Sequence, residues 1–373
     1  MSLADMIRLA SLKRPFGFPV WSRKVAVICF YEDLPHLPKI IGSFLTKDYL
    51  SILVIDRDDI SDCDIEWVSK FPPNKISGLS KGKISLDSEI VFASNNYVWW
   101  KLNYAITKIL AFGYNGFFVC MPMPCDHTSP CIPSFYDSHK NELEKLYGML
   151  DDFESKKILA AKIRSLVTGN IGYLRLSDYP EYFHPMVRPV EGDIIIDGGI
   201  SENISSQLRM CNNIGKNGRL YGFEPDPVGF TKAHKQINDK KLEGTFRLIH
   251  CGLWSEKCTT SFTSSREGSR VANDHINPNT RCEMTTVDCF VKEQCLNNVT
   301  FIKLDVEGSE FNVLRSSVET IVRYKPRMAI SVYHNPEDLF SLPLLIKKML
   351  PKCRLYLGHH TSCTFETILY VLP

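Results

Sequence analysis

The chain has 373 residues, of which 44% are hydrophobic and 23% are charged, and this is the balance of a globular protein long enough to form two domains. This composition excludes a collagen-like chain, wholesale disorder and a small disulfide-rich scaffold. The 44 Lys and Arg residues and the 42 Asp and Glu residues leave a net charge of +2, without an extended basic block. Such a chain has no positive field that recruits a polyanion, and we expect no nucleic-acid partner.

Residues 1–23 form a predicted N-terminal arm that lacks the apolar segment and the small-residue cleavage site of a secretion signal. The longest apolar stretch, from Ile109 to Cys125, is broken by Gly and Pro residues and is shorter than the ~20 apolar residues that cross a bilayer. We therefore expect no membrane span and a cytoplasmic location. The 13 cysteines are an odd number and lie mostly in apolar runs, which indicates free thiols.

Residues 24–139 are predicted to form a small, parallel α/β domain of Rossmann-like type. Short apolar runs, typical of strands buried on both faces, alternate here with helix-like segments, and the runs are KVAVICF, SILVID, EIVFAS and NGFFVCM. The first run leads into Tyr31-Glu32-Asp33-Leu34-Pro35, where a dinucleotide site would need G-x-G-x-x-G. The fold therefore does not imply a bound nucleotide, and nucleotide-sugar binding, partner docking and dimerisation stay open as roles.

Cys120, Cys125 and Cys131, with Asp126 and His127 among them, suggest a zinc site as one alternative in this domain. Structural zinc sites usually carry paired C-x(2–4)-C units, whereas these cysteines have four and five residues between them and no second pair. We predict a proline-rich loop here and no metal site.

Residues 140–181 are predicted to connect two domains through a helix. The segment 140–168 is polar and helix-forming, and its apolar residues recur at helical spacing, at Leu143, Leu146, Met149, Leu150 and Phe153. A helix packed on one or both domains is the favoured interpretation. The alternative is that this stripe forms the contact of a homodimer.

Residues 182–373 show the clearest alternation of strands and helices. Seven strand candidates follow one another, namely GDIIIDGG, GRLYGFEPD, TFRLIHCGL, VTFIKLDVEG, RMAISVYH, CRLYLGHH and FETILYVLP. The polar segment 256–288 interrupts this alternation between the third and fourth strands. We predict that it forms a short β-excursion, because long unstructured loops are uncommon inside compact domains.

The first two strands of this series end in residues that suit a ligand site, since ligands bind beyond the carboxyl ends of the strands in open α/β sheets. Asp197-Gly198-Gly199 ends the first strand: glycines let a backbone approach a ligand closely, and the carboxylate can accept a ligand ammonium or structure the loop. Glu224 ends the second strand, where an acidic residue usually accepts hydrogen bonds from both hydroxyls of a ribose.

The fourth and fifth strands end in titratable residues. Asp305, Glu307 and Glu310 follow the fourth strand, and carboxylates this close repel one another unless a cation, a proton or hydrogen-bond donors lie among them. His334 follows the fifth strand and would lie beside them if the two strands are neighbours. Clusters of this kind are typical of functional sites.

These motifs together resemble the FkbM family of S-adenosylmethionine-dependent methyltransferases, in the order EYFHP, GDIIIDGG, GRLYGFEPD, HCGLWS, TFIKLDVEGSE, KPRMAISVYHNPEDL and CRLYLGHH. The resemblance covers residues 182–373, about half the chain. It implies an α/β fold class: a C-terminal class I, Rossmann-like methyltransferase domain with a seven-stranded sheet, preceded by the smaller parallel α/β domain. It also implies S-adenosylmethionine as cofactor and methyl transfer to a hydroxyl, commonly of a sugar or polyketide.

The resemblance further implies roles for individual residues. Asp197, Gly198 and Gly199 would form the loop at the methionine end of the cofactor, Glu224 would hold its ribose, and Cys251-Gly252 would lie beside its adenine. The family loop typically continues D-x-G-A-x-x-G, whereas this chain has Ile200 for the small residue and Asn203 for the later glycine. Asn can adopt the positive φ that such a turn requires.

The leading functional hypothesis is an O-methyltransferase that acts on a small-molecule or glycan acceptor. Asp305, Glu307 and His334 are the candidate catalytic residues for activation of the acceptor hydroxyl, and Ser269 and Arg270 are candidate substrate contacts. A divalent metal held by Asp305 is an alternative, but we favour a metal-free reaction. The rival hypothesis is a catalytically silent binding or scaffold subunit whose altered loop no longer holds the cofactor.

Overall fold

The computed structural model describes residues 25–29, 50–54, 76–78, 89–93, 118–120, 138–168, 173–263, 270–271, 280–361 and 364–373. The chain divides into two compact units, one of Met1–Glu144, Leu159–Arg175 and Ser362–Thr364, the other of Lys145–Ile158, Leu176–Thr361 and Phe365–Pro373. None of the helices in these described ranges is long and apolar enough to span a bilayer.

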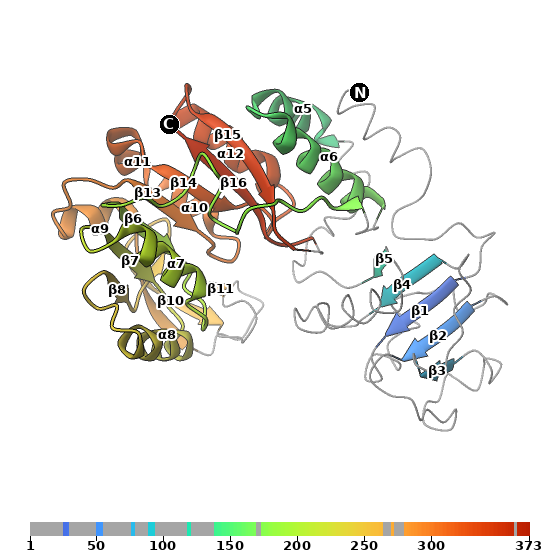
Figure 1. The fold of residues 1–373 in the computed structure, drawn as a ribbon, viewed down its shortest axis with the longest axis horizontal. Coiled ribbons are helices and arrows are strands. Elements are labelled where there is room, and N and C mark those ends of the chain that lie inside the picture. Colours follow the sequence, from blue (N-terminus) through green and yellow to red (C-terminus); the bar gives the residue numbers. More distant parts are fainter. Residues whose placement is uncertain are drawn as a thin grey trace. The chain divides into compact units, whose positions relative to one another are not determined.

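The first unit contains a sheet in which every strand pairs in parallel with its neighbours (Figure 1). Its order is β3-β2-β1-β4-β5, with β1 (Val25–Cys29), β2 (Leu50–Val54), β3 (Ile76–Gly78), β4 (Glu89–Ala93) and β5 (Phe118–Cys120). Four of these strands lie in the apolar runs of the sequence, and β3 was not predicted. Cys125 and Cys131 lie outside the described residues, and the role of residues 24–139 stays a prediction.

Two helices, α5 (Lys140–Met149) and α6 (Phe153–Thr168), form where one connecting helix was predicted. The apolar stripe is buried at Leu143, Leu146 and Leu150, but Phe153 is 68% exposed. The helix stops because Leu150 forms a β-bridge with Leu355 and because the Asp152 carboxylate accepts a hydrogen bond from the Ser155 amide, which caps the start of α6. The stripe therefore ends before Phe153.

The second unit is built on a mostly parallel central sheet, as the sequence predicts for an α/β fold. Its order is β15-β16-β14-β13-β6-β7-β8. The parallel strands are β6 (Ile194–Gly198), β7 (Arg219–Phe223), β8 (Phe246–Ile249), β13 (Phe301–Leu304) and β14 (Arg327–Ser331). The last two strands, β15 (Arg354–His359) and β16 (Thr367–Leu372), form an antiparallel hairpin beside β14.

In the chain, helices lie between the strands of this sheet, namely α7 (Ser205–Ile214), α8 (Pro227–Asp239), α9 (Val287–Glu293), α10 (Glu310–Arg315), α11 (Val318–Tyr324) and α12 (Asp338–Met349). Sequence signals fix several of their starts. The Asp226 carboxylate accepts a hydrogen bond from the Gly229 amide ahead of a proline at the start of α8, and Thr286 caps α9 in the same way.

The polar insertion forms a second, small sheet, and the predicted β-excursion is confirmed. Its order is β11-β10-β12-β9, with β9 (Gly252–Leu253), β10 (Cys258–Thr263), β11 (Arg270–Val271) and β12 (Thr280–Thr285). The run TFRLIHCGL was expected to be one strand. It is split instead, because β8 ends at Ile249 and Gly252 pairs with Met284 of the small sheet.

The carboxyl ends of β6, β7 and β13 meet at one edge of the central sheet. The Gly199 and Ile200 amides both donate to the Phe223 carbonyl at 3.2 Å, and the Asp305 amide donates to the Gly198 carbonyl at 3.0 Å. Connections leave β6 in opposite directions, since β7 lies on one side of it and β13 on the other. This is the topological switch point at which open α/β sheets bind ligands.

Candidate functional site

Gly199 is the residue at which the loop after β6 requires glycine. Its φ is +85°, and a Cβ atom placed there would lie 1.8 Å from the carbonyl oxygen of Asp305. Gly198 is also confined, since a Cβ atom there would lie 2.9 Å from Leu253 and 3.0 Å from Val306. The absence of side chains thus lets the ends of β6 and β13 approach each other closely.

Asp197 points into the protein. Its side chain is fully buried, and one carboxylate oxygen accepts a hydrogen bond from Gln207 Nε2 at 2.9 Å. The other oxygen lies 3.1 Å from Lys303 Nζ. Burial raises the pKa of the Asp197 carboxyl, although Lys303 and Gln207 oppose the shift. Of the two roles open to this carboxylate, the contacts favour the structural one, in which it braces the loop.

Glu224 lies at the end of β7, one strand away from the glycine loop. Its carboxyl group is largely buried, and Oε1 accepts a hydrogen bond from the Asp226 amide at 2.7 Å. Burial raises the pKa of this carboxyl to about 8, although the Asp226 amide opposes the shift. Gly229 allows this placement, since a Cβ atom there would lie only 3.3 Å from the Glu224 carboxyl carbon.

Cys251 and Gly252 leave the central sheet just beyond β8. Gly252 starts β9 and is buried, and a Cβ atom there would lie 2.6 Å from the Met284 sulfur. Cys251 is a half-buried free thiol, and burial raises its pKa to about 11. The thiol is therefore protonated at neutral pH and is a poor nucleophile, so that Cys251 acts as a small, weakly polar side chain.

Asp305 follows β13 and is surrounded by donors. Tyr182 donates its hydroxyl to Oδ2 at 2.9 Å, and Tyr333 donates its hydroxyl to Oδ1 at 3.1 Å. Burial raises the pKa of the Asp305 carboxyl, but the Lys303 and His334 cations outweigh burial and leave the pKa below its ordinary value. About a fifth of the side chain, 22%, is exposed. The group is thus an anion that a neighbouring molecule can reach.

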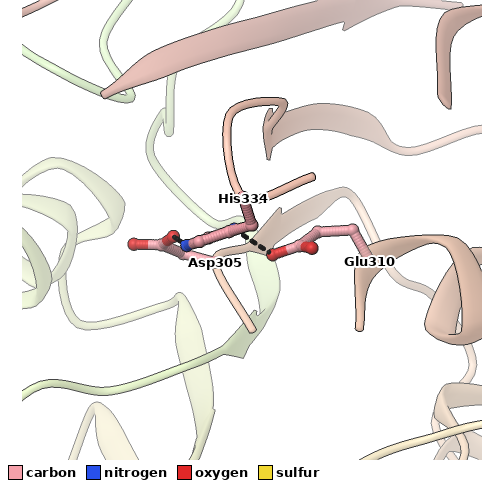
Figure 2. Close-up of side chains that lie close together, drawn as sticks. All are labelled: Asp305, Glu310 and His334. Carbon is pink, nitrogen blue, oxygen red and sulfur yellow. Dashed lines mark ion pairs between the residues drawn. The ribbon is translucent and has the colours of Figure 1, made fainter. Parts of the chain in front are cut away.

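His334 lies between carboxylates, as the sequence predicts for neighbouring strands β13 and β14 (Figure 2). Its Nδ1 is 3.0 Å from Oε1 of Glu310, and its Nε2 is 3.6 Å from Oδ1 of Asp305 and 3.5 Å from Oε2 of Glu307. Burial alone would lower its pKa, but Glu310, Glu307 and Asp305 raise the pKa to about 10. At neutral pH the ring is therefore an imidazolium without a lone pair to act as a base.

Asp305, Glu310 and His334 are also the group, among the described residues, whose ligand atoms lie within 4.8 Å of one another and could hold a metal ion. Figure 2 places the imidazole between the two carboxylates, and each carboxylate faces a different ring nitrogen. An ion bound through one nitrogen would leave the other carboxylate on the far side of the ring. An imidazolium that donates one N–H group toward each carboxylate fits this arrangement better than a single metal ion does.

His334 gives a stability prediction, because its folded pKa of about 10 lies above the ordinary 6.5. The stabilisation should be complete below pH 6.5 and be lost as the pH rises toward 10, with a limiting slope of about 1.4 kcal/mol per pH unit. Urea unfolding from pH 6 to 9.5 should therefore show a steeper loss for the wild type than for His334→Gln. Equal slopes would mean that the ring is neutral in the folded state.

Residues 196–365 match the family model of the methyltransferase FkbM domain. This part of the chain is an FkbM methyltransferase domain. A crystal structure of methyltransferase FkbM from Methylobacillus flagellatus KT has a similar fold, with a TM-score of 0.64 and 18% identity over 99% of this chain and 99% of that one.

Two further solved structures share less with the chain. Fibrillarin from Aeropyrum pernix, with natively bound S-adenosyl-L-methionine, has 15% identity and a TM-score of 0.30, over 49% of this chain and 67% of that one. A SAM-dependent O-methyltransferase from Thermotoga maritima has 12% identity and a TM-score of 0.28, over 52% of this chain and 66% of that one. No curated protein matches the sequence.

The FkbM domain of this chain accommodates its two unusual loop residues in different ways. The Ile200 side chain is 1% exposed and packs in the core, where it lies against Gly222. Asn203 could adopt a positive φ, but it does not do so here. Its side-chain oxygen accepts a hydrogen bond from the Ser205 amide at 3.0 Å, which satisfies a backbone donor at the start of α7.

The structure does not test the two candidate substrate contacts. Ser269 lies outside the described residues. Arg270 belongs to β11, whose backbone pairs with Thr263 of β10 in the small sheet. Their proposed role in acceptor binding stays a prediction.

Three residues of the candidate site were not predicted from the sequence. Tyr182 and Tyr333 bind Asp305, and Lys303 binds Asp197. A signal for Lys303 was present, since it is the charged residue inside the otherwise apolar strand FIKL. The sequence carries no signal for Tyr182 beyond its place in EYFHP, because Tyr182 and Asp305 are 123 residues apart in the chain.

Proposed function

We propose that the FkbM domain binds S-adenosylmethionine and transfers its methyl group to a hydroxyl of a sugar, a glycan or a related natural product. The observation that carries the proposal is the meeting of three features at one sheet edge: the glycine loop after β6, the buried Glu224 carboxyl after β7 and the anionic Asp305 after β13. The strand order, with one reversed strand next to the edge of a parallel sheet, supports assignment to the class I, Rossmann-like methyltransferases.

The cofactor fits the residues that line this edge. Gly198 and Gly199 have no side chains, so that the methionine end of the cofactor can approach the backbone of the loop. The buried Asp197 carboxylate stabilises the loop from the protein interior. Glu224 would accept hydrogen bonds from the ribose hydroxyls, and Cys251-Gly252 would border the adenine. When bound, the cofactor supplies an electrophilic methyl group on a sulfonium sulfur.

Asp305 is the proposed catalytic residue. Its carboxylate is partly exposed and is oriented by the Tyr182 and Tyr333 hydroxyls, so it can accept a hydrogen bond from an acceptor hydroxyl. A carboxylate with a lowered pKa is a weak base, and its contribution is to aim the hydroxyl and to take the proton as the new C–O bond forms. Glu307, whose side chain is 37% exposed, is a second group that can receive this proton.

His334 is better suited to positioning than to proton removal. As an imidazolium held by Glu310, it stabilises the negative charges of Asp305 and Glu307 and offsets the repulsion between them. This assignment revises the sequence-based hypothesis, in which the ring itself was a candidate base. The same arrangement supports a metal-free reaction, in which turnover survives an excess of chelator.

A small-molecule or glycan acceptor suits the chain better than a nucleic acid. The net charge is +2 and the sequence has no extended basic block, whereas nucleic-acid binding relies on neutralising many phosphates.

The alternative of a silent scaffold predicts no cofactor binding. Calorimetry decides between an enzyme and a silent scaffold. Micromolar binding of S-adenosylmethionine supports the enzyme, and no heat at millimolar ligand would favour the scaffold.

Glu224→Ala tests the ribose contact. Above about pH 8, where the buried carboxyl is ionised, the substitution should weaken S-adenosylmethionine binding by roughly 1.5–3 kcal/mol, the range for hydrogen bonds to charged groups. Calorimetry measures the effect, and Glu243→Ala, at an exposed position, serves as a matched control that should bind as the wild type does. Binding that stays within about twofold in Glu224→Ala would remove this carboxylate from the cofactor site.

A further inference from the structure

Lys303 is a buried cation at the junction between the cofactor loop and the catalytic carboxylate. Its side chain is 2% exposed, although it comes from a strand whose other residues are apolar. Lysine is almost never fully buried unless it is paired. Here Nζ lies 3.1 Å from Oδ1 of Asp197, and the ammonium also stands 5.2 Å from the centre of the Tyr182 ring.

The ammonium does more than neutralise Asp197. Nζ donates to the Gly199 carbonyl at 2.6 Å and approaches the Gly198 carbonyl at 3.3 Å. Both carbonyls belong to the turn in which Gly199 takes its positive φ. The Gly199 and Ile200 amides of the same turn donate hydrogen bonds to the Phe223 carbonyl of the next strand. Lys303 thus makes contacts that fix the loop from β13, the strand that leads directly to Asp305.

We propose that Lys303 is a positioning residue that holds the Gly198-Gly199 turn in the shape that receives S-adenosylmethionine and in register with Asp305. The inference rests on the proposed function, which assigns this turn to the cofactor, and deepens it by naming the group that sets the turn. Lys303 would not touch the cofactor. It would act through the two carbonyls, and the charge balance with Asp197 would be a separate, structural role.

A double substitution separates these two roles. Lys303→Met alone leaves Asp197 as a buried charge without a partner, and this variant is expected to fold poorly. Asp197→Asn combined with Lys303→Met removes both charges at nearly constant side-chain size, a change that proteins often tolerate. Asp197→Asn alone, which keeps Lys303 and its contacts with both carbonyls, is the reference, and if Lys303 served only to neutralise Asp197, the double variant would behave as this reference does. If Lys303 sets the turn, the double variant folds but its turn is loosened.

Two measurements on the full chain decide the matter. Hydrogen exchange of the Gly199 and Ile200 amides, without ligand, should become at least about tenfold faster in the double variant, while exchange in β8 stays unchanged. Affinity for S-adenosylmethionine, measured by calorimetry, should fall at least about tenfold, or about 1.4 kcal/mol. Exchange and affinity within about twofold of those of Asp197→Asn would overturn the proposal.

The remaining outcomes are also decisive. A double variant that does not fold would place Lys303 in the folding of the sheet rather than in the setting of the turn, and would overturn the proposal. If the wild type itself binds no S-adenosylmethionine, the proposed function fails. Exchange at Gly199 and Ile200 then still tests the turn, because that measurement needs no ligand.

Discussion

Replacing Asp305 with Asn is expected to lower methyl transfer by about 10²–10⁴-fold, the usual contribution of a positioned proton acceptor. Asn has nearly the same size and can still bind the Tyr182 and Tyr333 hydroxyls, but it carries no charge and cannot take the acceptor proton. Binding of S-adenosylmethionine should change little, because Asp305 is not assigned to the cofactor. The measurement is transfer of a radioactive methyl group from S-adenosylmethionine to a panel of sugars and to a glycan extract.

The controls for this experiment separate three explanations. Asp239→Asn changes an exposed carboxylate at the end of α8 and should leave transfer unchanged. A chelator added to the wild type tests the metal-free reaction, and chelator-sensitive turnover would show that this version is wrong. Full transfer by Asp305→Asn would remove the residue from catalysis, and a parallel loss of cofactor affinity would assign it to the cofactor site instead.

The central sheet could be predicted from the sequence because its strands are buried on both faces and therefore appear as short apolar runs. The same reasoning placed the site, since Asp197, Glu224, Asp305 and His334 are the polar residues that end such runs. Their position at the ends of neighbouring parallel strands follows from the topology alone. It was thus predictable that these residues share one edge of the sheet.

The partners within the site were not predictable, because they depend on contacts between distant segments. Tyr182 lies far from Asp305 in sequence, and only the folded chain brings its hydroxyl to the carboxylate. The charge state of His334 depends on Glu310, a fully buried carboxylate that begins α10 and whose Oε1 also accepts a hydrogen bond from the Val306 amide. A sequence pattern shows an acidic residue and a histidine, but not which nitrogen faces which oxygen.

The end of the predicted helical stripe and the split of the third strand were missed for a similar reason. Phe153 continues the helical spacing, yet the chain turns before it because Leu150 forms a bridge with Leu355, some 200 residues away in sequence. Gly252 continues an apolar run, yet it pairs with the small sheet. In both places a distant strand overrides the local pattern, which is the usual limit of propensity arguments.

Gly199→Ala is expected to produce a large loss of stability. The φ of +85° is strained for any residue with a side chain, and the added Cβ would lie 1.8 Å from the Asp305 carbonyl oxygen, which belongs to backbone and cannot rotate away. Strain of this kind costs about 1–3 kcal/mol, and relief of the overlap costs about as much again.

Gly192→Ala provides a matched control for this prediction. Its φ is +82°, nearly the same as that of Gly199, but a Cβ atom there would meet nothing within 4 Å. The cost of the control substitution therefore comes from the backbone conformation alone, about 1–3 kcal/mol, and the difference between the two variants measures the close approach of β6 and β13. Urea unfolding gives both values. A Gly199→Ala variant no less stable than Gly192→Ala would mean that the two strand ends can separate at little cost, and the loop would then not be the rigid support that cofactor binding at this edge requires.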